Sequence, residues 1–227
     1  MNDTINEVRN TGIPGQTARR IRKKRKGRKK RMGKRMKLFI LSALLVLILL
    51  LSAAGIRVYK KYLYIGEKQL SEQVLAYKDL VEKYASEQGI DEYLDYLLAI
   101  MQVESGGQGK DVMQSSESAE LPPNTLEPEE SIKQACIYFK ELLGYKERYG
   151  VDLDSLIQAY NYGPLYMRYV RDNGGKHTAK LAESYAEEKS GGIRKTYKNA
   201  IAIRANGGWR YAYGNMFYVE LVKQYIG

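Results

Sequence analysis

Glu104 is the residue whose position in the sequence most clearly suggests chemistry. It stands at the end of an apolar helical pattern and just before the glycines at 106 and 107. Counting back by four and by seven places it on the same helix face as Ile100 and Leu97, which predicts apolar surroundings. Such surroundings disfavour the charged carboxylate and raise its pKa, so that the group can donate a proton near neutral pH. The alternative is a carboxylate at a helix end that turns into water.

The elements that must position Glu104 are predicted to be helices. No run of alternating polar and apolar residues is found after residue 71, so we expect an all-α domain. Apolar residues recur at helical spacing in residues 72–88, 91–104, 131–145, 154–160, 165–170, 177–188 and 214–225. One connection, residues 106–129, is long and rich in glycine, serine and proline. Loops of this length in compact domains are often functional, and this one starts beside Glu104.

Three short blocks in this region carry a resemblance to a known family. They are Glu-Ser-Gly at 104–106, Met-Gln-Ser-Ser-Glu at 113–117 and Gln-Ala-Tyr-Asn-Tyr-Gly at 158–163. In this order, the blocks resemble the lysozyme-like muramidases and soluble lytic transglycosylases. The most similar group is the CwlT-like lysozyme domain of cell-wall hydrolases from Gram-positive conjugative elements. The similarity covers residues 72–227 and implies a lysozyme-like helical fold.

The resemblance also implies a substrate and a set of site residues. Glu104 would be the catalytic acid that protonates the glycosidic oxygen between N-acetylmuramic acid and N-acetylglucosamine in peptidoglycan. An amide from Asn161 and the ring faces of Tyr160 or Tyr162 would suit a sugar. The candidate substrate-binding residues are Ser105, Gln114, Ser116, Glu117, Tyr160, Asn161 and Tyr162. Without the family, the tyrosines would be expected to pack in the core.

The loop departs from the lytic transglycosylase pattern. Only nine residues separate Glu104 from Gln114, and no Gly-Leu pair precedes the Met-Gln pair. Hydrolysis is therefore expected, although transglycosylation stays open. A hydrolase must stabilise an oxocarbenium-like state or activate water. We predict that Asp111 has this role as the second catalytic residue, and Ser116 and Glu117 are the alternatives in the loop. The acetamido group of the substrate could also serve in its place.

The front of the chain predicts a membrane anchor. Residues 1–37 carry a net charge of +13, whereas the whole chain carries +11. Residues 38–56 are uncharged and would span about 28 Å as a helix, which is close to the thickness of a bilayer core. Because the positive charges precede this segment, we expect a type II protein with residues 57–71 as a stalk and residues 72–227 as an extracellular catalytic domain at the cell wall. A cleaved signal peptide is the alternative, but its charged region would be unusually long.

Composition argues against several other classes of function. Cys136 and His177 are the only residues of their types, so neither a cysteine-based nor a histidine-based metal cluster is expected, and no cofactor is predicted. His177 is expected to help start a helix. Residues 1–37 form a basic arm that we expect to be cytoplasmic. Because the positive-inside rule explains its charge, we expect no specific nucleic acid partner.

The partners that we expect are peptidoglycan glycan strands, the cytoplasmic membrane through residues 38–56, and conjugation or secretion machinery. Related proteins often carry a second, cysteine-peptidase domain, and we expect this chain to cut glycan only. The alternative function is a non-catalytic peptidoglycan-binding scaffold that keeps the groove without turnover.

Overall fold

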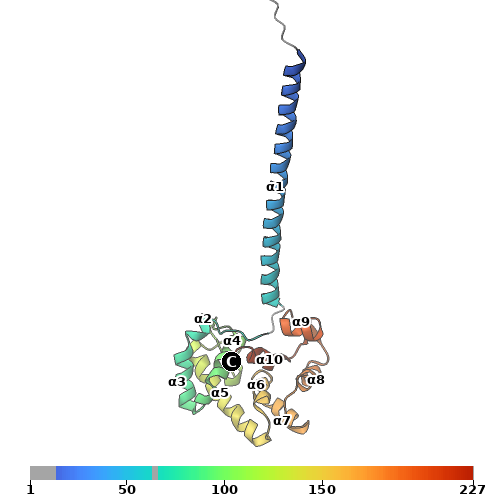
Figure 1. The fold of residues 1–227 in the computed structure, drawn as a ribbon. Helices are drawn as coiled ribbons and strands as arrows, with labels where there is room; N and C mark the ends of the chain where they lie inside the picture. The colour runs from blue at the N-terminus through green and yellow to red at the C-terminus, as the bar shows by residue number, and fades with distance from the viewer. Residues whose placement is uncertain (1–13, 63–65, 227) are drawn as a thin grey trace, which may run out of the picture. The chain divides into compact units, whose positions relative to one another are not determined.

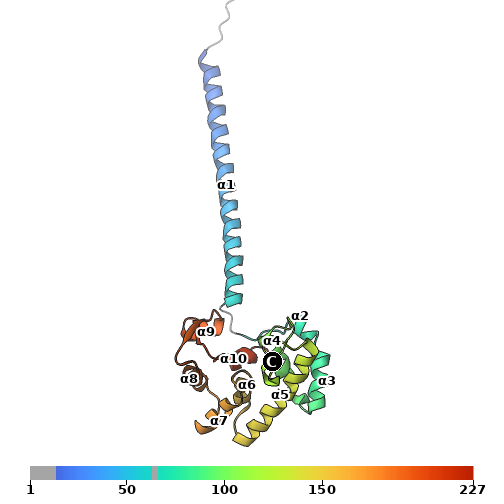
Figure 2. The same ribbon diagram turned by 180° about the vertical axis from the view of Figure 1, so that it is seen from behind.

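The computed structural model describes residues 14–62 and 66–226, and the chain forms two compact units, Met1–Val58 and Tyr59–Gly227. The first 13 residues of the predicted basic arm and residues 63–65 of the predicted stalk lie outside the described residues. Figures 1 and 2 show the long helix of the first unit and the helical second unit from two sides.

Helix α1, Pro14–Tyr62, contains the predicted apolar segment. Its part Gly33–Val58 is long and apolar enough to cross a membrane, and its side chains are exposed. The hydroxyls of Ser42 and Ser52 donate hydrogen bonds to the carbonyls of Phe39 and Ile48 in the same helix. Because these polar groups are satisfied within the helix, they add little cost to placing it in hydrocarbon.

The second unit is built mainly from helices, which confirms the predicted all-α class. Short 3-10 turns lie at Asp91–Tyr93 and Glu117–Ala119. The helices are α2 Glu72–Leu75, α3 Lys78–Gln88, α4 Leu94–Glu104, α5 Pro128–Tyr149, α6 Leu153–Tyr162, α7 Leu165–Asp172, α8 Ala179–Ser190, α9 Ala200–Asn206 and α10 Tyr218–Lys223.

This mainly helical region also contains one short strand pair that the sequence pattern did not indicate. Strands β1, Arg194–Thr196, and β2, Trp209–Tyr211, form an antiparallel pair in which Lys195 lies opposite Arg210. Three residues are too few to produce a recognisable alternation, so the pattern gave no signal.

The helix expected at 72–88 is divided into α2 and α3, and several other helix boundaries differ from the expectation. Two of these differences have a clear local cause. Helix α5 starts earlier, because Glu127 and Glu130 form a capping box around Pro128 in the first turn. Helix α10 begins at Tyr218, not at residue 214, because Gly214 has a positive φ of 42° and Asn215 accepts a hydrogen bond from Phe217 N–H. The chain therefore makes a turn at 214–217 before the helix.

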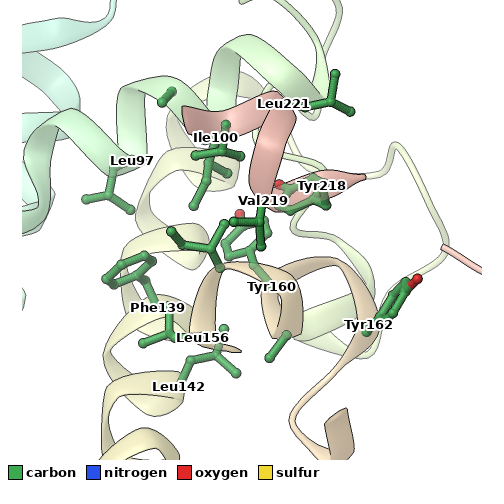
Figure 3. Packing of buried hydrophobic residues seen from close by; sticks show 14 of the residues in the cluster. Leu97, Ile100, Phe139, Leu142, Leu156, Tyr160, Tyr162, Tyr218, Val219 and Leu221 are labelled. Atoms are coloured by element: carbon green, nitrogen blue, oxygen red, sulfur yellow. The ribbon is translucent and has the colours of Figure 1, made fainter. Parts of the chain in front are cut away.

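The core lies where α4, α5, α6 and α10 meet (Figure 3), and α6 contacts both α5 and α10. Leu97 and Ile100 of α4 are fully buried there, as the periodicity predicted. Burial of a side chain of this size contributes about 1.5–3 kcal/mol to folding. Because both residues precede Glu104 on one face of α4, this packing fixes the helix end that carries the acid.

Candidate active site

Glu104 is the last residue of α4 and is half-buried. Its Oε1 accepts a 2.5 Å hydrogen bond from the Tyr218 hydroxyl on α10. Burial raises the pKa of the Glu104 carboxyl to about 7; the Tyr218 hydrogen bond opposes this shift and the negative charge of Asp111 adds to it. The direction agrees with the expectation from the apolar helix face. A carboxyl with this pKa is available as an acid near neutral pH.

Ser105 stabilises the start of the loop that follows Glu104 through two hydrogen bonds. Its Oγ donates to the carbonyl of Val112 at 2.6 Å and accepts from Gly107 N–H at 3.0 Å. Gly107 has a φ of 75°, and a Cβ there would lie 2.8 Å from the carbonyl carbon of Gln73. Ser105 therefore holds the glycine turn against the neighbouring backbone, and its hydroxyl is already engaged.

Asp111 occupies the centre of a buried hydrogen-bond network. Oδ1 accepts from Ser115 N–H at 2.9 Å and from Ser131 Oγ at 2.6 Å, and Oδ2 accepts from Ser116 N–H at 3.0 Å. Burial tends to raise the pKa of Asp111, but the hydrogen bonds from Ser116 and Ser131 outweigh it, and the pKa lies below its ordinary value. Asp111 is 2% exposed, and its carboxylate is directed at the loop backbone and α5.

Ser116 has a similar place in the loop. Its buried Oγ accepts hydrogen bonds from the N–H groups of Thr125 and Leu126, both at 3.1 Å. These bonds close the second half of the long loop upon its first half. Ser116 is therefore placed to shape the loop, although the sequence suggested contact with substrate.

A groove of about 770 Å³ opens between this loop and the C-terminal end of α6. The predicted substrate-binding residues that the structure brings together in its lining are Gln114, Glu117, Tyr160, Asn161 and Tyr162. Other parts of the chain add further lining groups, among them Tyr138, Tyr213 and Gly214. The groove thus presents aromatic rings, amides and carboxylates together, as a sugar-binding site requires.

The tyrosines of the groove are held by their hydroxyls. Tyr160 donates to the Met113 carbonyl at 3.0 Å, and Tyr162 donates to the Ala182 carbonyl at 3.2 Å. Figure 3 shows that Tyr160 lies close to the core formed by α4 and α10. Because the hydroxyls are anchored in the protein, only part of each ring is available to a ligand.

Glu104 lines a second, smaller pocket of about 280 Å³. Its lining includes Glu104, Tyr218, Lys195 and Arg210, together with Asn161 and Gly214, which also line the larger groove. The two pockets are therefore adjacent, and a chain of sugars in the groove could reach the acid.

Asn161 and Gly214 form a tight contact where the pockets meet. Asn161 Oδ1 accepts a hydrogen bond of 2.7 Å from Asn215 N–H. A Cβ at Gly214 would lie 2.7 Å from Asn161 Oδ1 and 2.6 Å from the ring of Tyr162. Glycine at this position permits the close approach.

Sequence reasoning missed Tyr218, Lys195 and Arg210 as site residues. Tyr218 lies within residues 214–225, which were predicted as a helix, but nothing in that pattern singled it out. The two cations are on the short strands that the pattern did not reveal.

Within residues 66–226, no group of three or more His, Cys, Asp or Glu side chains is arranged to hold a metal. The Nδ1 of His177 lies 2.9 Å from the Tyr166 hydroxyl, and His177 N–H donates to Asp152. Thr178, the next residue, caps α8. These contacts tie the start of α8 to neighbouring elements, close to the predicted role of His177.

Comparisons with known proteins connect this geometry to a family. Residues 71–226 match the family model described as Lysozyme-like. The membrane protein YocA of Bacillus subtilis (strain 168), named as uncharacterized, is 36% identical over 210 residues, covering 90% of each chain. The bifunctional muramidase/DL-endopeptidase CwlT of the same strain is 34% identical over 158 residues, covering 69% of this chain and 43% of CwlT.

A solved structure is also similar. It is SAV0400 from Staphylococcus aureus subsp. aureus Mu50, described as similar to a lipoprotein of the NLP/P60 family. It is 59% identical with a TM-score of 0.70, and the match covers 70% of this chain and 54% of that one. This chain thus spans about half of the solved chain and less than half of CwlT.

Proposed function

Because the chain belongs to the lysozyme-like family, we propose that it is a membrane-anchored peptidoglycan glycosidase with Glu104 as its general acid. The observation that carries the proposal is the position of this carboxyl, which has a pKa of about 7 and lines the smaller of two adjoining pockets. The muramidase activity in the name of CwlT supports the choice of the glycan, and not the peptide, as the part that is cut.

In the proposed reaction, a glycan strand lies in the groove with one sugar against Tyr160 and Tyr162. The bond between N-acetylmuramic acid and N-acetylglucosamine then lies beside Glu104, which donates its proton to the leaving oxygen. Positive charge develops on the sugar ring that remains. The resulting Glu104 carboxylate next acts as a base and takes a proton from the group that attacks this ring.

We propose that Asp111 acts indirectly, in place of the direct catalytic role that the sequence suggested. Its oxygens already accept the hydrogen bonds that shape the loop. Its negative charge also favours the protonated form of Glu104. With Asp111 engaged, the acetamido group of the substrate is the better candidate to stabilise the developing charge. Ser105 and Ser116 are proposed to shape the loop in the same way.

The proposed location of the protein rests on the apolar helix. The part Gly33–Val58 would cross the cytoplasmic membrane, and the positive charges before it would remain inside. The lysozyme-like domain would then face the cell wall as the external part of a type II protein, where it would open peptidoglycan locally. YocA, named as a membrane protein, supports anchoring. A role beside conjugation or secretion machinery is the partner proposal, and crosslinking in conjugating cells would test it.

The test uses the full chain in detergent micelles on purified cell walls. Glu104→Gln should abolish the release of soluble muropeptides and leave wall binding intact. Glu82→Gln, an exposed change on α3 away from both pockets, is the matched control and should release muropeptides at the wild-type rate. Unchanged release by Glu104→Gln would reject the acid, and wall binding without release by the wild type would favour the scaffold alternative.

Product analysis by mass spectrometry separates the two reaction types. Hydrolysis adds one water and leaves a reducing end, whereas transglycosylation gives an anhydro-sugar of the same mass as the uncut unit. The same experiment therefore decides which group attacks the sugar.

A further inference from the structure

Two cations face the pocket that contains the acid. Lys195 of β1 and Arg210 of β2 are directly opposite in the strand register, and both line the pocket with Glu104. Successive side chains of a strand alternate between the two faces of a sheet. The register thus places both cations on one face, while the neighbours of Arg210, Trp209 and Tyr211, lie on the other face.

This arrangement is not explained by the stability of the strand pair. Like charges directly opposite each other on paired strands repel and destabilise the pair. Among the salt bridges of residues 66–226, none includes Lys195 or Arg210. Within this described part of the chain, no carboxylate therefore forms a salt bridge with the positive charges on this face.

Arg210 is held in place by neighbouring groups. Its guanidinium donates a hydrogen bond to the Gly214 carbonyl and lies over the ring of Tyr197, 5.3 Å from the centroid. Asn215 Nδ2 in turn donates to the Tyr197 hydroxyl at 3.1 Å. The half-buried guanidinium is oriented before any ligand arrives, and such preorganisation lowers the cost of binding.

The cations share the pocket with Glu104 but do not pair with it. The Glu104 carboxyl is bonded to Tyr218 instead. A salt bridge to Lys195 or Arg210 would stabilise the carboxylate and oppose its use as an acid. The pocket thus holds a group that must keep its proton beside two charges that are available to another anion.

We propose that Lys195 and Arg210 form an anion subsite that binds a carboxylate carried by the muramoyl residue of the substrate. The inference rests on the proposed function. In a muramoyl residue, the lactyl group is attached to the same ring as the carbon of the scissile bond. A carboxylate on this arm therefore stays near the acid, whereas chitin-like glycans have no such group. The subsite would select muramoyl glycans over neutral ones.

Two sources could supply this carboxylate: the lactyl group itself after loss of the peptide, or the first acidic residue of the peptide stem. The test measures binding by calorimetry, so that it does not depend on turnover. The full chain carrying Glu104→Gln in detergent micelles is titrated with three muramoyl tetrasaccharides. These carry free lactyl carboxylates, lactyl carboxamides, or a short stem that ends in an acidic residue.

We expect the parent protein to bind at least one carboxylate-bearing ligand about tenfold more tightly than the carboxamide, as a charge-assisted hydrogen bond would provide. Lys195→Gln with Arg210→Gln should abolish this preference and leave carboxamide binding unchanged. Arg210→Lys keeps the charge and should retain most of the preference. The exposed changes Lys198→Gln and Arg204→Gln are the matched controls and should retain all of it.

The ligand that is preferred identifies the source of the carboxylate. Equal binding of all three ligands by the parent, or an unchanged preference in the double variant, would overturn the subsite. The parent protein could show the carboxylate preference and the double variant lose it while the wild type fails to cleave walls. In that case the proposed function fails and the subsite stands. If no ligand binds, both are overturned.

Discussion

The Tyr218 hydroxyl donates a 2.5 Å hydrogen bond to Glu104 Oε1 and joins two residues that lie 114 positions apart in the sequence. Tyr218 opens α10, and Glu104 ends α4. The pKa of Tyr218 is raised well above its ordinary value, chiefly by burial, so the phenol keeps its proton and remains a donor. The bond thus orients the acid and moderates its pKa.

Replacement of Tyr218 by phenylalanine should raise the pKa of Glu104 above about 7, because the hydrogen bond that stabilises the carboxylate is lost. We expect the alkaline limb of the pH profile of kcat/KM on solubilised glycan to move to higher pH. Tyr96→Phe on α4 is the control and should keep the wild-type profile. An alkaline limb at the same pH in Tyr218→Phe would show that this bond does not control the acid.

Protonation of Glu104 also predicts how stability depends on pH. The unfolded chain releases this proton near pH 4.5 and the folded chain near pH 7, so the folded state binds more protons between these values. The free energy of unfolding should therefore fall as the pH rises from about 4.5 to about 7. Glu104→Gln removes this contribution. We expect the free energy of unfolding of the variant to exceed that of the wild type by about 1–3 kcal/mol at pH 8.

Urea unfolding of both chains at pH 4 and pH 8 measures this difference. The pH 4 comparison is the internal control, because the side chain at position 104 is then mostly protonated in both states of the wild type. An equal gain at both pH values would indicate a packing effect of the amide and would contradict the raised pKa.

Asp111→Asn should disrupt the loop, because the carboxylate accepts hydrogen bonds from Ser115, Ser116 and Ser131. We expect a loss of about 2–3 kcal/mol of stability, as for hydrogen bonds to a charged group. Ser131→Ala, which removes one of these donors and the acceptor for Met113 N–H, should reproduce part of the loss. Thermal unfolding with activity assays at low temperature measures both effects. An Asn variant of full stability and no activity would instead support direct catalysis by Asp111.

The sequence was sufficient to predict those features that depend on local periodicity. The apolar face of α4 follows from the spacing of Leu97 and Ile100, and it led to the raised pKa of Glu104. The motif at 158–163 pointed to Tyr160, Asn161 and Tyr162, which line the groove, but not to Tyr138 and Tyr213, which also line it. These features depend on one helix or on one short block of residues.

Features that depend on distant partners could not be predicted in this way. Asp111 looked like a free loop carboxylate, because its partner Ser131 lies 20 positions further along the chain. Lys195 and Arg210 are brought together by strands of three residues, which are too short for a periodic signal. The bond between Tyr218 and Glu104 likewise requires knowledge of how α10 packs on α4.

The contact at Gly214 provides the last prediction. An alanine Cβ would lie 2.6 Å from the Tyr162 ring and 2.7 Å from Asn161 Oδ1, at a positive φ of 42°. Because both neighbours line the groove, Gly214→Ala should displace them, lower kcat/KM on glycan and cost about 1–3 kcal/mol of stability. Gly144→Ala in α5, where a Cβ meets nothing within 4 Å, is the control and should stabilise the helix by about 0.5–1 kcal/mol without affecting activity. Thermal unfolding and glycan assays on both variants measure these effects. A wild-type kcat/KM in Gly214→Ala would contradict this prediction. It would mean that Asn161 and Tyr162 can shift without affecting catalysis by Glu104.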